Sequence, residues 1–166
     1  LTQNPAVDTQ PVFSPDGRTL AYLAMSRAGY EADRLRIVVR DWATGSERSL
    51  DLRADATARG DRSPSEIGWT RDGQALLLTA DHLGQRAVFA LDPQQGTARV
   101  VIGEGTALAP QSAQGKRILY GLHSLLGPTE LFTAAADGSD VRRVTHLNDE
   151  RVAAARFGRP EAFSFT

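Results

Sequence analysis

Short apolar runs separated by polar turns extend along most of the chain. Residues 20–23 (Leu-Ala-Tyr-Leu) and 88–91 (Val-Phe-Ala-Leu) are typical of these runs. Apolar runs of this length, bounded by Gly, Asp and Pro, are typical of β-strands. A helix is suggested only over residues 150–156, a short segment followed by Gly158 and Pro160. The pattern therefore predicts an all-β fold.

A unit of strand, tight turn and strand occurs three times. Residues 12–24 resemble residues 67–79, and residues 108–122 form a weaker third copy. Each copy has one glycine in its turn: Gly17, Gly73 and Gly115. In the first two copies the glycine follows Asp, and Asp-Gly is a strong signal for a two-residue hairpin loop in which both residues take positive φ. We therefore expect a tight hairpin in each copy.

Each copy is followed by a second strand pair, joined by a turn that begins with Asp. These turns lie at residues 41–45, 92–96 and 137–138. The glycines of the first hairpins recur after 56 and then 42 residues, and four antiparallel strands in roughly 40–50 residues are typical of one propeller blade. The sequence therefore predicts a partial β-propeller of about three four-stranded antiparallel blades, at approximately residues 8–52, 64–103 and 105–147.

Two sequence segments resemble known propeller proteins. Residues 13–18 (Phe-Ser-Pro-Asp-Gly-Arg) are similar to the propeller repeats of the prolyl oligopeptidase family and of TolB-type propellers. Residues 156–166 (Arg-Phe-Gly-Arg-Pro-Glu-Ala-Phe-Ser-Phe-Thr) resemble the segment that leads from the last propeller strand into an α/β-hydrolase domain in dipeptidyl aminopeptidases and acylaminoacyl peptidases. Residues 137–148 before it resemble the final blade. The resemblance implies propeller blades over 1–150 and an exit segment over 151–166.

The resemblance implies a parent serine peptidase that cleaves short peptides, with this propeller limiting access to the site. The predicted partner is then an α/β-hydrolase domain of the same parent chain. A nucleophile elbow of the form Gly-x-Ser-x-Gly does not occur in residues 1–166, although such hydrolases need one. We therefore expect no catalytic residue here. The alternative is a TolB-like protein-binding propeller without enzyme activity.

Metal and cofactor chemistry is not indicated by the titratable residues. The chain has no Cys, and its histidines, His82, His123 and His146, lack the spacing of metal ligands. We expect these histidines in loops or at strand ends. Aspartates of the turns could bind calcium only if several carboxylates met in one loop, and each turn repeats a single one: Asp16, Asp72 and Asp137. They are better explained by hydrogen bonds within the turns, so no metal or cofactor is predicted.

Two polar stretches, residues 26–34 and 53–65, are longer than the repeat requires and are predicted to be surface loops. The only plausible substrate contacts are charged residues that we assign to these loops: Glu31, Arg34, Arg59, Arg62 and Glu66. No motif selects among them. Of the two tryptophans, Trp69 occupies the position of Phe13 and is expected in the core between blades, whereas Trp42 lies in a turn and is expected to be half exposed.

The composition narrows the range of partners. Lys and Arg number 19, Asp and Glu number 20, and the formal net charge is −1. Such a balance gives no attraction to nucleic acid or anionic membranes, and the apolar runs are far shorter than the roughly 18 residues of a membrane span. Abundant Ala, Arg and Gly favour a bacterial source, in cytoplasm or periplasm. Because closed propellers have roughly 4–8 blades, we expect three blades to self-associate or to need further blades.

Overall fold

The computed structural model describes residues 2–52, 62–161, 163 and 165. Strands dominate these residues, and they are β1 (Asp8–Phe13), β2 (Thr19–Ala24), β3 (Arg36–Asp41), β4 (Glu47–Leu50), β5 (Pro64–Trp69), β6 (Leu76–His82), β7 (Gln85–Leu91), β8 (Ala98–Ile102), β9 (Thr106–Ala113), β10 (Arg117–Ser124), β11 (Gly127–Ala135) and β12 (Arg142–Arg143). A 3-10 turn, η1 (Gln114–Lys116), and one helix, α1 (Asp149–Ala154), complete the described elements.

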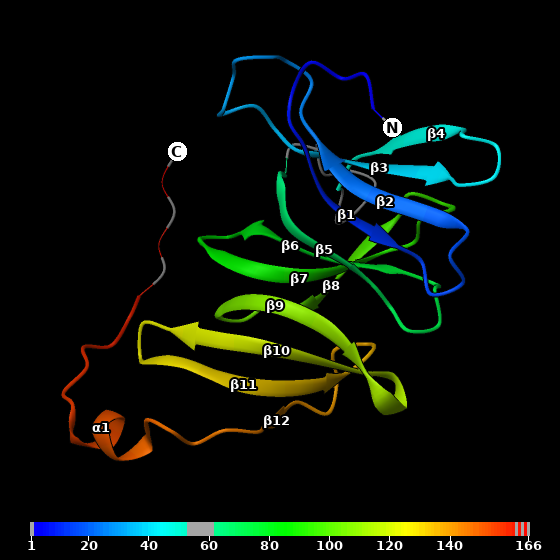
Figure 1. Ribbon diagram of the computed structural model, residues 1–166. Coiled ribbons are helices and arrows are strands. Elements are labelled where there is room, and N and C mark those ends of the chain that lie inside the picture. Colours follow the sequence, from blue (N-terminus) through cyan, green and yellow to red (C-terminus); the bar gives the residue numbers. More distant parts are fainter. Residues whose placement is uncertain (1, 53–61, 162, 164, 166) are drawn as a thin grey trace.

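The strands form three antiparallel groups of four, which we call blades 1, 2 and 3. Blade 1 has the order β1-β2-β3-β4, blade 2 consists of β5 to β8, and blade 3 of β9 to β12. A single parallel bridge between Arg86 and Thr106 joins blades 2 and 3 at one end. The blades follow one another along the molecule from blue to orange (Figure 1). The predicted all-β, three-bladed partial propeller is confirmed.

Two apolar cores lie between the blades. The first fills the space between blades 1 and 2, and its members are Ala21, Leu23, Ile37, Val39, Leu52, Leu76, Leu78, Ala80, Ala87, Phe89 and Leu91. The second lies between blades 2 and 3, and its members are Leu77, Val88, Ala90, Val101, Ile102, Ala107, Ile118, Tyr120 and Ala134. Because side chains alternate across a strand, blade 2 contributes one face to each core. The core is therefore located at the contacts between blades.

The first hairpin turn differs from the two-residue loop expected from Asp-Gly. In blade 1 the Ser14 amide donates to the Thr19 carbonyl (2.8 Å), and the Gly17 amide donates to the Ser14 carbonyl (2.8 Å). Gly17 takes positive φ (70°), whereas Asp16 does not. This is a four-residue loop with Pro15 and Gly17 at the positions that a type I turn favours. The expectation that both loop residues have positive φ is therefore wrong.

Blade 2 repeats this turn, and blade 3 does not. The Gly73 amide donates to the Thr70 carbonyl at 2.9 Å, and Gly73 has a φ of 71°. In the third copy η1 makes the turn instead, and Lys116 takes positive φ (57°). The third copy has no Asp before its glycine, so it lacks the side chain that holds the other two turns.

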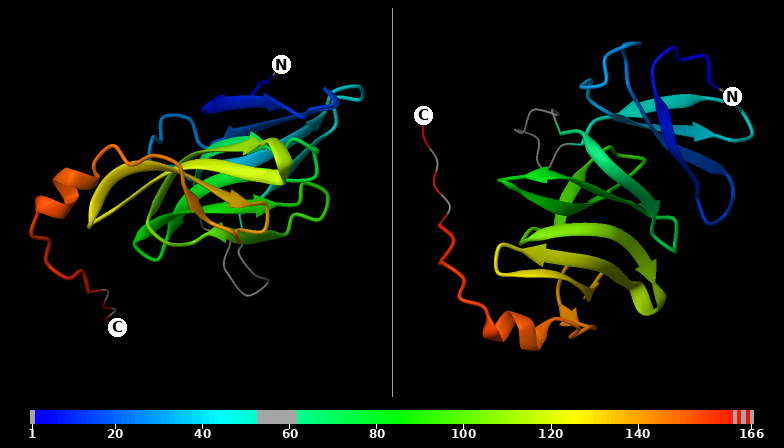
Figure 2. Two further views of the ribbon diagram at one scale, coloured as in Figure 1. Left: turned by 90° about the horizontal axis from the view of Figure 1, so that it is seen from below. Right: turned by 60° about the vertical axis from the view of Figure 1, so that its left-hand side comes forward.

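The chain leaves blade 3 through α1 and then runs back beside the blades (Figures 1 and 2). Helix α1 begins at Asp149, one residue before the segment that the sequence suggested, and ends at Ala154. Pro160 and Phe163 of the segment that follows line a groove together with Leu83 and Leu125, which lie in the connections β6–β7 and β10–β11. The C-terminal segment thus lies near the same ends of blades 2 and 3.

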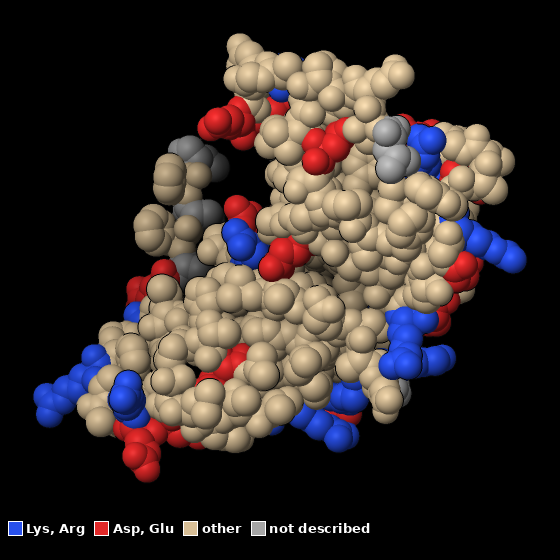
Figure 3. Space-filling view, in the orientation of Figure 1, with Lys and Arg blue, Asp and Glu red and all other residues tan. Residues whose placement is uncertain are grey.

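Charge is distributed without one dominant patch on the face that Figure 3 shows. Lys and Arg side chains lie mostly around the margin of this face, and Asp and Glu lie among them. None of the helices within the described residues has the length and apolar character needed to cross a membrane.

Candidate functional site at the loop end of the blades

The connections between strands divide between the two ends of each blade. Antiparallel neighbours reverse direction, so the connections β2–β3, β6–β7 and β10–β11 all lie at one end, as the register of the strands requires. The tight Asp-containing turns lie at the opposite end. The β2–β3 connection is the longest of these three and includes residues 26–34. The C-terminal segment also lies at the first end. We call it the loop end.

Exposed apolar side chains gather at the loop end. Leu83 is 89% exposed, Leu125 is 81% exposed and Phe163 is 86% exposed. A groove between blades 2 and 3 and the C-terminal segment is lined by these three residues and by Pro160. Polar residues, among them Gln85 and Glu161, line the same groove. Large exposed apolar side chains that lie together on a folded protein are candidates for contact with a partner. The sequence analysis missed this groove, although adjacent leucines in a polar turn, Leu125 and Leu126, were a visible signal.

Loop 26–34 is organised by its own contacts. Asp33 accepts hydrogen bonds from the backbone amides of Ser26 (3.1 Å) and Arg27 (3.0 Å), and it pairs with the Arg27 guanidinium at 3.0 Å. That guanidinium lies 4.3 Å from the centre of the Tyr30 ring. The side-chain bond from Arg27 is the main reason that the pKa of Asp33 is lowered. Glu31 is exposed on this loop, where a ligand can reach it.

The predicted contact arginines do not converge on one site. Arg34 pairs with Asp51 at 2.9 Å. Arg62 lies against His82, with 3.2 Å between Nη2 and the ring Nδ1, and its guanidinium is 5.6 Å from the Phe89 ring centre. Arg59 lies outside the described residues. These arginines are engaged with residues of their own or neighbouring strands, which limits their freedom to hold a substrate.

Glu66 is a correction to the sequence interpretation. It lies in β5 and not in a loop. Its Oε2 accepts hydrogen bonds from the Thr79 hydroxyl (2.8 Å) and from the backbone amide of Ala109 (2.9 Å). Ala109 belongs to β9, so Glu66 connects blade 2 to blade 3. Its role in the structure is to join the blades.

Glu130 of β11 is a buried carboxylate that the sequence analysis missed. Only 5% of the residue is exposed. It accepts a short hydrogen bond from the Thr145 hydroxyl, and bonds from the backbone amide (2.9 Å) and side-chain amide (3.0 Å) of Asn148. The Thr145 hydroxyl, followed by the Asn148 amides, lowers the pKa of Glu130 to about 2. Glu130 thus fixes the segment between β12 and α1. A lone Glu beside an apolar Leu-Phe pair was the available signal.

The three histidines lie apart, at strand ends and in a connection. His82 ends β6 and contacts the Phe89 ring edge-on at 5.8 Å between ring centres. His123 lies near the end of β10, and His146 contacts Asp149 at 2.9 Å. Within the described residues, no three His, Cys, Asp or Glu side chains are grouped as metal ligands would be.

The turn aspartates act as the sequence indicates. Ser14 donates to Asp16 at 2.6 Å, and the Arg18 amide donates to the same carboxylate at 3.0 Å. These bonds, with the Ser14 hydroxyl first, lower the pKa of Asp16. The hydroxyl and the amide of Ser139 have the same effect on Asp137. The pairing of Ser14 and Asp16 therefore belongs to the turn and not to a catalytic triad.

The tryptophans occupy the predicted environments. Trp69 packs against the core between blades 1 and 2, and its indole donates to the Val12 carbonyl at 3.2 Å. Trp42 is 46% exposed and contacts Phe13 edge-on, with the ring centres 4.8 Å apart.

Comparison with known proteins identifies sequence relatives over half of the chain or more. No protein-family model matches the sequence. The chain is 30% identical over 145 residues to dipeptidyl-peptidase 5 of Trichophyton equinum, which covers 85% of this chain and 19% of that protein. It is 38% identical over 81 residues to a probable dipeptidyl-peptidase 5 of Aspergillus clavatus, which covers 49% of this chain and 10% of that protein. The chain therefore spans at most about a fifth of the length of these curated relatives.

Solved structures support the fold. Dipeptidyl peptidase 4 of Porphyromonas gingivalis superposes with a TM-score of 0.66 at 13% identity, over 89% of this chain and 28% of that one. A putative TolB of Agrobacterium tumefaciens superposes with a TM-score of 0.65 at 15% identity, over 86% of this chain and 50% of that one. At such low identity these likenesses concern the propeller architecture alone.

The comparisons correct the expected bacterial source and support the resemblance to the prolyl oligopeptidase family. The sequence relatives named above are fungal proteins, so the bacterial source inferred from Ala, Arg and Gly content is not supported. Composition of this kind reflects a GC-rich genome, which is not confined to bacteria. The dipeptidyl-peptidase relatives support the family resemblance that the repeat at residues 13–18 carries. The chain belongs to the β-propeller part of the prolyl oligopeptidase family.

Proposed function

We propose that this chain is the non-catalytic propeller of a serine peptidase that acts on short peptides. The observation that carries the proposal is the 30% identity to a dipeptidyl-peptidase over 145 residues. In the proposed parent protein, a Ser nucleophile, a His base and an Asp that orients it perform acyl transfer. The nucleophile elbow is not in residues 1–166, so the propeller acts through access and docking.

The loop end is the surface that this function requires. It places Leu83, Leu125 and Phe163, all strongly exposed, beside the C-terminal segment. That segment resembles the exit into a hydrolase domain, so a domain attached to it would lie close to the apolar groove. In the proposed arrangement the hydrolase covers this groove, and the propeller excludes folded proteins from the catalytic site.

The test uses the complete product of the gene that encodes this chain. We expect it to hydrolyse dipeptidyl chromogenic amides, to lose that activity with a serine-directed fluorophosphonate, and to carry the label outside residues 1–166. The 166-residue chain alone should neither turn over these substrates nor take the label. A label on a serine of this chain, or a complete product that neither cleaves nor labels, would contradict the proposal.

The alternative function is that of a TolB-like protein-binding propeller without an enzyme attached. It is favoured by the superposition on the putative TolB of Agrobacterium tumefaciens, of which this chain covers 50%. The same experiment separates the two functions. A complete gene product without a fluorophosphonate-reactive serine supports the binding module, and the apolar groove is then the surface to test for protein partners.

A further inference from the structure

Two pockets lie between successive blades at the end opposite the loop end, which we call the turn end. The acidic pocket lies between blades 1 and 2, and its lining includes Asp16, Asp72 and Asp92. The basic pocket lies between blades 2 and 3, and its lining includes Arg71, Lys116 and Arg117. Their volumes are similar, about 310 and about 300 Å³. The two pockets therefore differ mainly in the sign of their charge.

The strand register shows that the two pockets occupy equivalent places in the repeat. The pairs that close the first turns are Phe13 with Leu20, Trp69 with Leu76 and Ser112 with Ile118. Counting from these pairs, Lys116 of the basic pocket stands where the acidic pocket has Gln74. Arg71 of the basic pocket stands where the acidic pocket has Pro15. Each wall of the basic pocket has thus gained a cation.

The outer turn of the basic pocket has also lost a carboxylate. The Asp92 amide closes the outer turn of blade 2 by donating to the Thr97 carbonyl. In blade 3 the Ala135 amide closes the same turn by donating to the Ser139 carbonyl. An alanine therefore replaces the aspartate at this position, and the charge of the pocket between blades is inverted from one pair of blades to the next.

Asp72 is the one carboxylate among the described residues that line the basic pocket. It accepts hydrogen bonds from the Thr70 hydroxyl at 2.7 Å and from the Gln74 backbone amide at 3.1 Å. Both donors belong to the turn that contains Asp72. This carboxylate is therefore bound to its own turn and is not the partner of either added cation.

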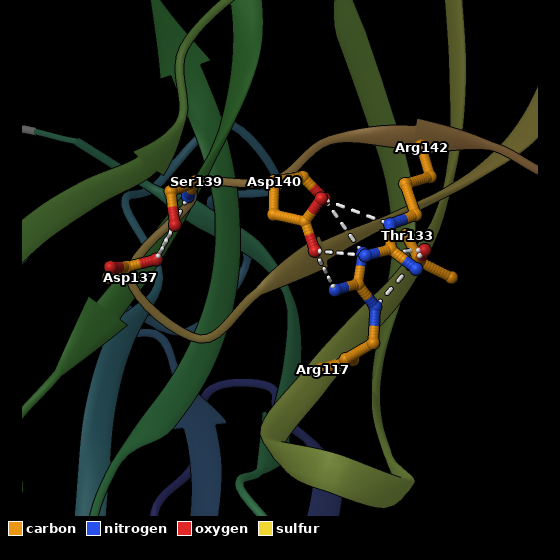
Figure 4. A network of polar contacts seen from close by, with 6 residues as sticks. All are labelled: Arg117, Thr133, Asp137, Ser139, Asp140 and Arg142. Carbon is orange, nitrogen blue, oxygen red and sulfur yellow. Dashed lines mark hydrogen bonds and ion pairs between the residues drawn. The ribbon is translucent and has the colours of Figure 1, made fainter.

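Arg117 is held by its own blade. Its guanidinium donates to the Asp140 carboxylate at 2.8 Å and to the Thr133 hydroxyl at 2.9 Å (Figure 4). Arg142 pairs with the same carboxylate at 2.8 Å, so two guanidinium groups share one negative charge. Arg117 forms a fixed part of the pocket wall, and the cations left for a ligand are those of Arg71 and Lys116.

The side chains of Arg71 and Lys116 form no hydrogen bond or ion pair with the described residues. Both residues are exposed. The backbone amide of Arg71 donates to the Ser112 hydroxyl at 2.9 Å, and a hydroxyl that accepts one bond still has its hydrogen to donate. The basic pocket thus combines a guanidinium, an ammonium and a hydroxyl, all of which can donate to an anion.

Lys116 has a strained backbone. Its φ is 57°, whereas Arg18 and Gln74, at the same position of blades 1 and 2, do not have positive φ. The left-handed region costs a residue with a Cβ roughly 1–2 kcal/mol. Strain of this kind is concentrated at functional sites, where the surrounding structure maintains it. The strain at Lys116 is therefore a second observation that singles out this pocket.

We propose that the basic pocket binds a small organic oxyanion. Its carboxylate or phosphate group lies between Arg71 and Lys116, because charge-assisted hydrogen bonds are stronger than neutral ones. Its apolar part packs against Ala113, Ile118 and Ala136. Apolar walls with a few polar groups are typical of ligand pockets, whose volumes begin at roughly 300 Å³. The site lies at the turn end, away from the loop end, and goes beyond the proposed peptidase role.

Isothermal titration calorimetry on the complete product of the gene tests binding. The product is first treated with the serine-directed fluorophosphonate, so that a catalytic serine does not contribute. Phenyl phosphate or benzoate, which join an oxyanion to an apolar ring, should bind saturably, and the tighter of the two identifies the preferred group. Phenol, which has the ring alone, should not bind. Added NaCl should weaken binding, because the cations are exposed. Failure of both oxyanions to saturate, or equal binding of phenol, would overturn the proposal.

Substitutions determine where the oxyanion binds. The double variant Arg71→Gln/Lys116→Asn removes both charges, and Asn is chosen because it tolerates positive φ. The affinity for the tighter oxyanion should fall at least about tenfold. Arg18→Gln, at the Lys116 position of blade 1, is the matched control and should bind like the unaltered protein.

Circular dichroism verifies that each variant keeps its fold. Arg71→Gln alone, which keeps the backbone bond to Ser112, should give a smaller loss of affinity and provides the result if the double variant does not fold. If Arg71→Gln and the control Arg18→Gln bind equally well, the oxyanion binds elsewhere and the proposal is wrong.

Discussion

At the scale of single residues, one hydroxyl and one carboxylate organise each of the first two hairpins. The Ser14 hydroxyl donates to Asp16 and accepts from the Thr19 amide at 2.9 Å. Thr70 does the same in blade 2, where it donates to Asp72 at 2.7 Å and accepts from the Ala75 amide at 2.9 Å. The repeat in the sequence therefore encodes a hydrogen-bonded turn, in which Ser and Thr are interchangeable because the hydroxyl is what matters.

Two turn glycines are needed for different reasons, and this can be measured. At Gly17, with φ of 70°, a Cβ would meet no atom within 4 Å. Gly17→Ala should therefore cost only the backbone strain of about 1–2 kcal/mol. At Gly138, with φ of 92°, a Cβ would lie 2.1 Å from the Val101 carbonyl oxygen of blade 2. Gly138→Ala should lower the free energy of unfolding clearly more, as measured by denaturant titration. Equal losses would show that blades 2 and 3 separate easily at this point.

The carboxylate of Glu130 should make stability depend on acid. Its pKa is lowered to about 2 by the Thr145 hydroxyl and the Asn148 amides, so the ionised form stabilises the fold above the usual carboxyl value of about 4.3. That stabilisation is lost as the pH falls from there to about 2. Glu130→Gln should be less stable than the unaltered chain at neutral pH, and the difference should shrink over this range.

Denaturant titrations at a series of pH values measure this difference. Glu150→Gln, at an exposed position of α1, is the matched control and should follow the unaltered chain at every pH. A Glu130→Gln difference that stays constant from pH 7 to pH 2 would mean that the ionised carboxylate does not hold the 145–148 segment.

At the scale of strands, alternation and turn residues were enough to predict an all-β fold of about three four-stranded antiparallel blades. The same reasoning misplaced Glu66, because its partner Ala109 is 43 residues away and contributes only a backbone amide. Arg48 escaped notice for the same reason, since its partners are carbonyls of Pro93 and Gln94. Any residue can provide a backbone carbonyl or amide, so the residue type does not reveal which one does. Contacts between blades that use backbone groups were therefore not predictable from the sequence pattern.

Arg48 and Arg99 each donate hydrogen bonds to two backbone carbonyls in a turn of the next blade, and these contacts should contribute to stability within the chain. Arg48→Ala and Arg99→Ala each remove a charged donor that spans two blades, and each should lower the free energy of unfolding by about 1 kcal/mol, because exposed sites weaken such bonds. Arg71→Ala is the control, as this exposed arginine donates through its backbone amide, to Ser112 at 2.9 Å. Thermal and denaturant melts compare the stabilities of the three variants. If Arg48→Ala and Arg99→Ala melt like the control, packing alone holds the blades together.

At the scale of the whole molecule, the two ends of the blades have different characters. Turns that contain Asp and Gly close one end. The connection over residues 26–34, the two-residue turns at 83–84 and 125–126 and the C-terminal segment occupy the other (Figure 2). The sequence located residues 26–34 as a loop, but the groove beside Leu83 and Leu125 depends on where the C-terminal segment folds back. That placement is a tertiary contact, and a local pattern does not encode it.

The double role of blade 2 has a consequence for how the molecule opens. Its strands β6 and β7 are buried over 76–80 and 87–91, with one face in each core. Opening blade 1 or blade 3 disrupts one core, whereas opening blade 2 disrupts both. Local openings therefore begin at the ends of the array and reach the middle last. Native-state amide exchange should be slowest in β6 and β7 and faster in β3 and β10, with β12 exchanging first.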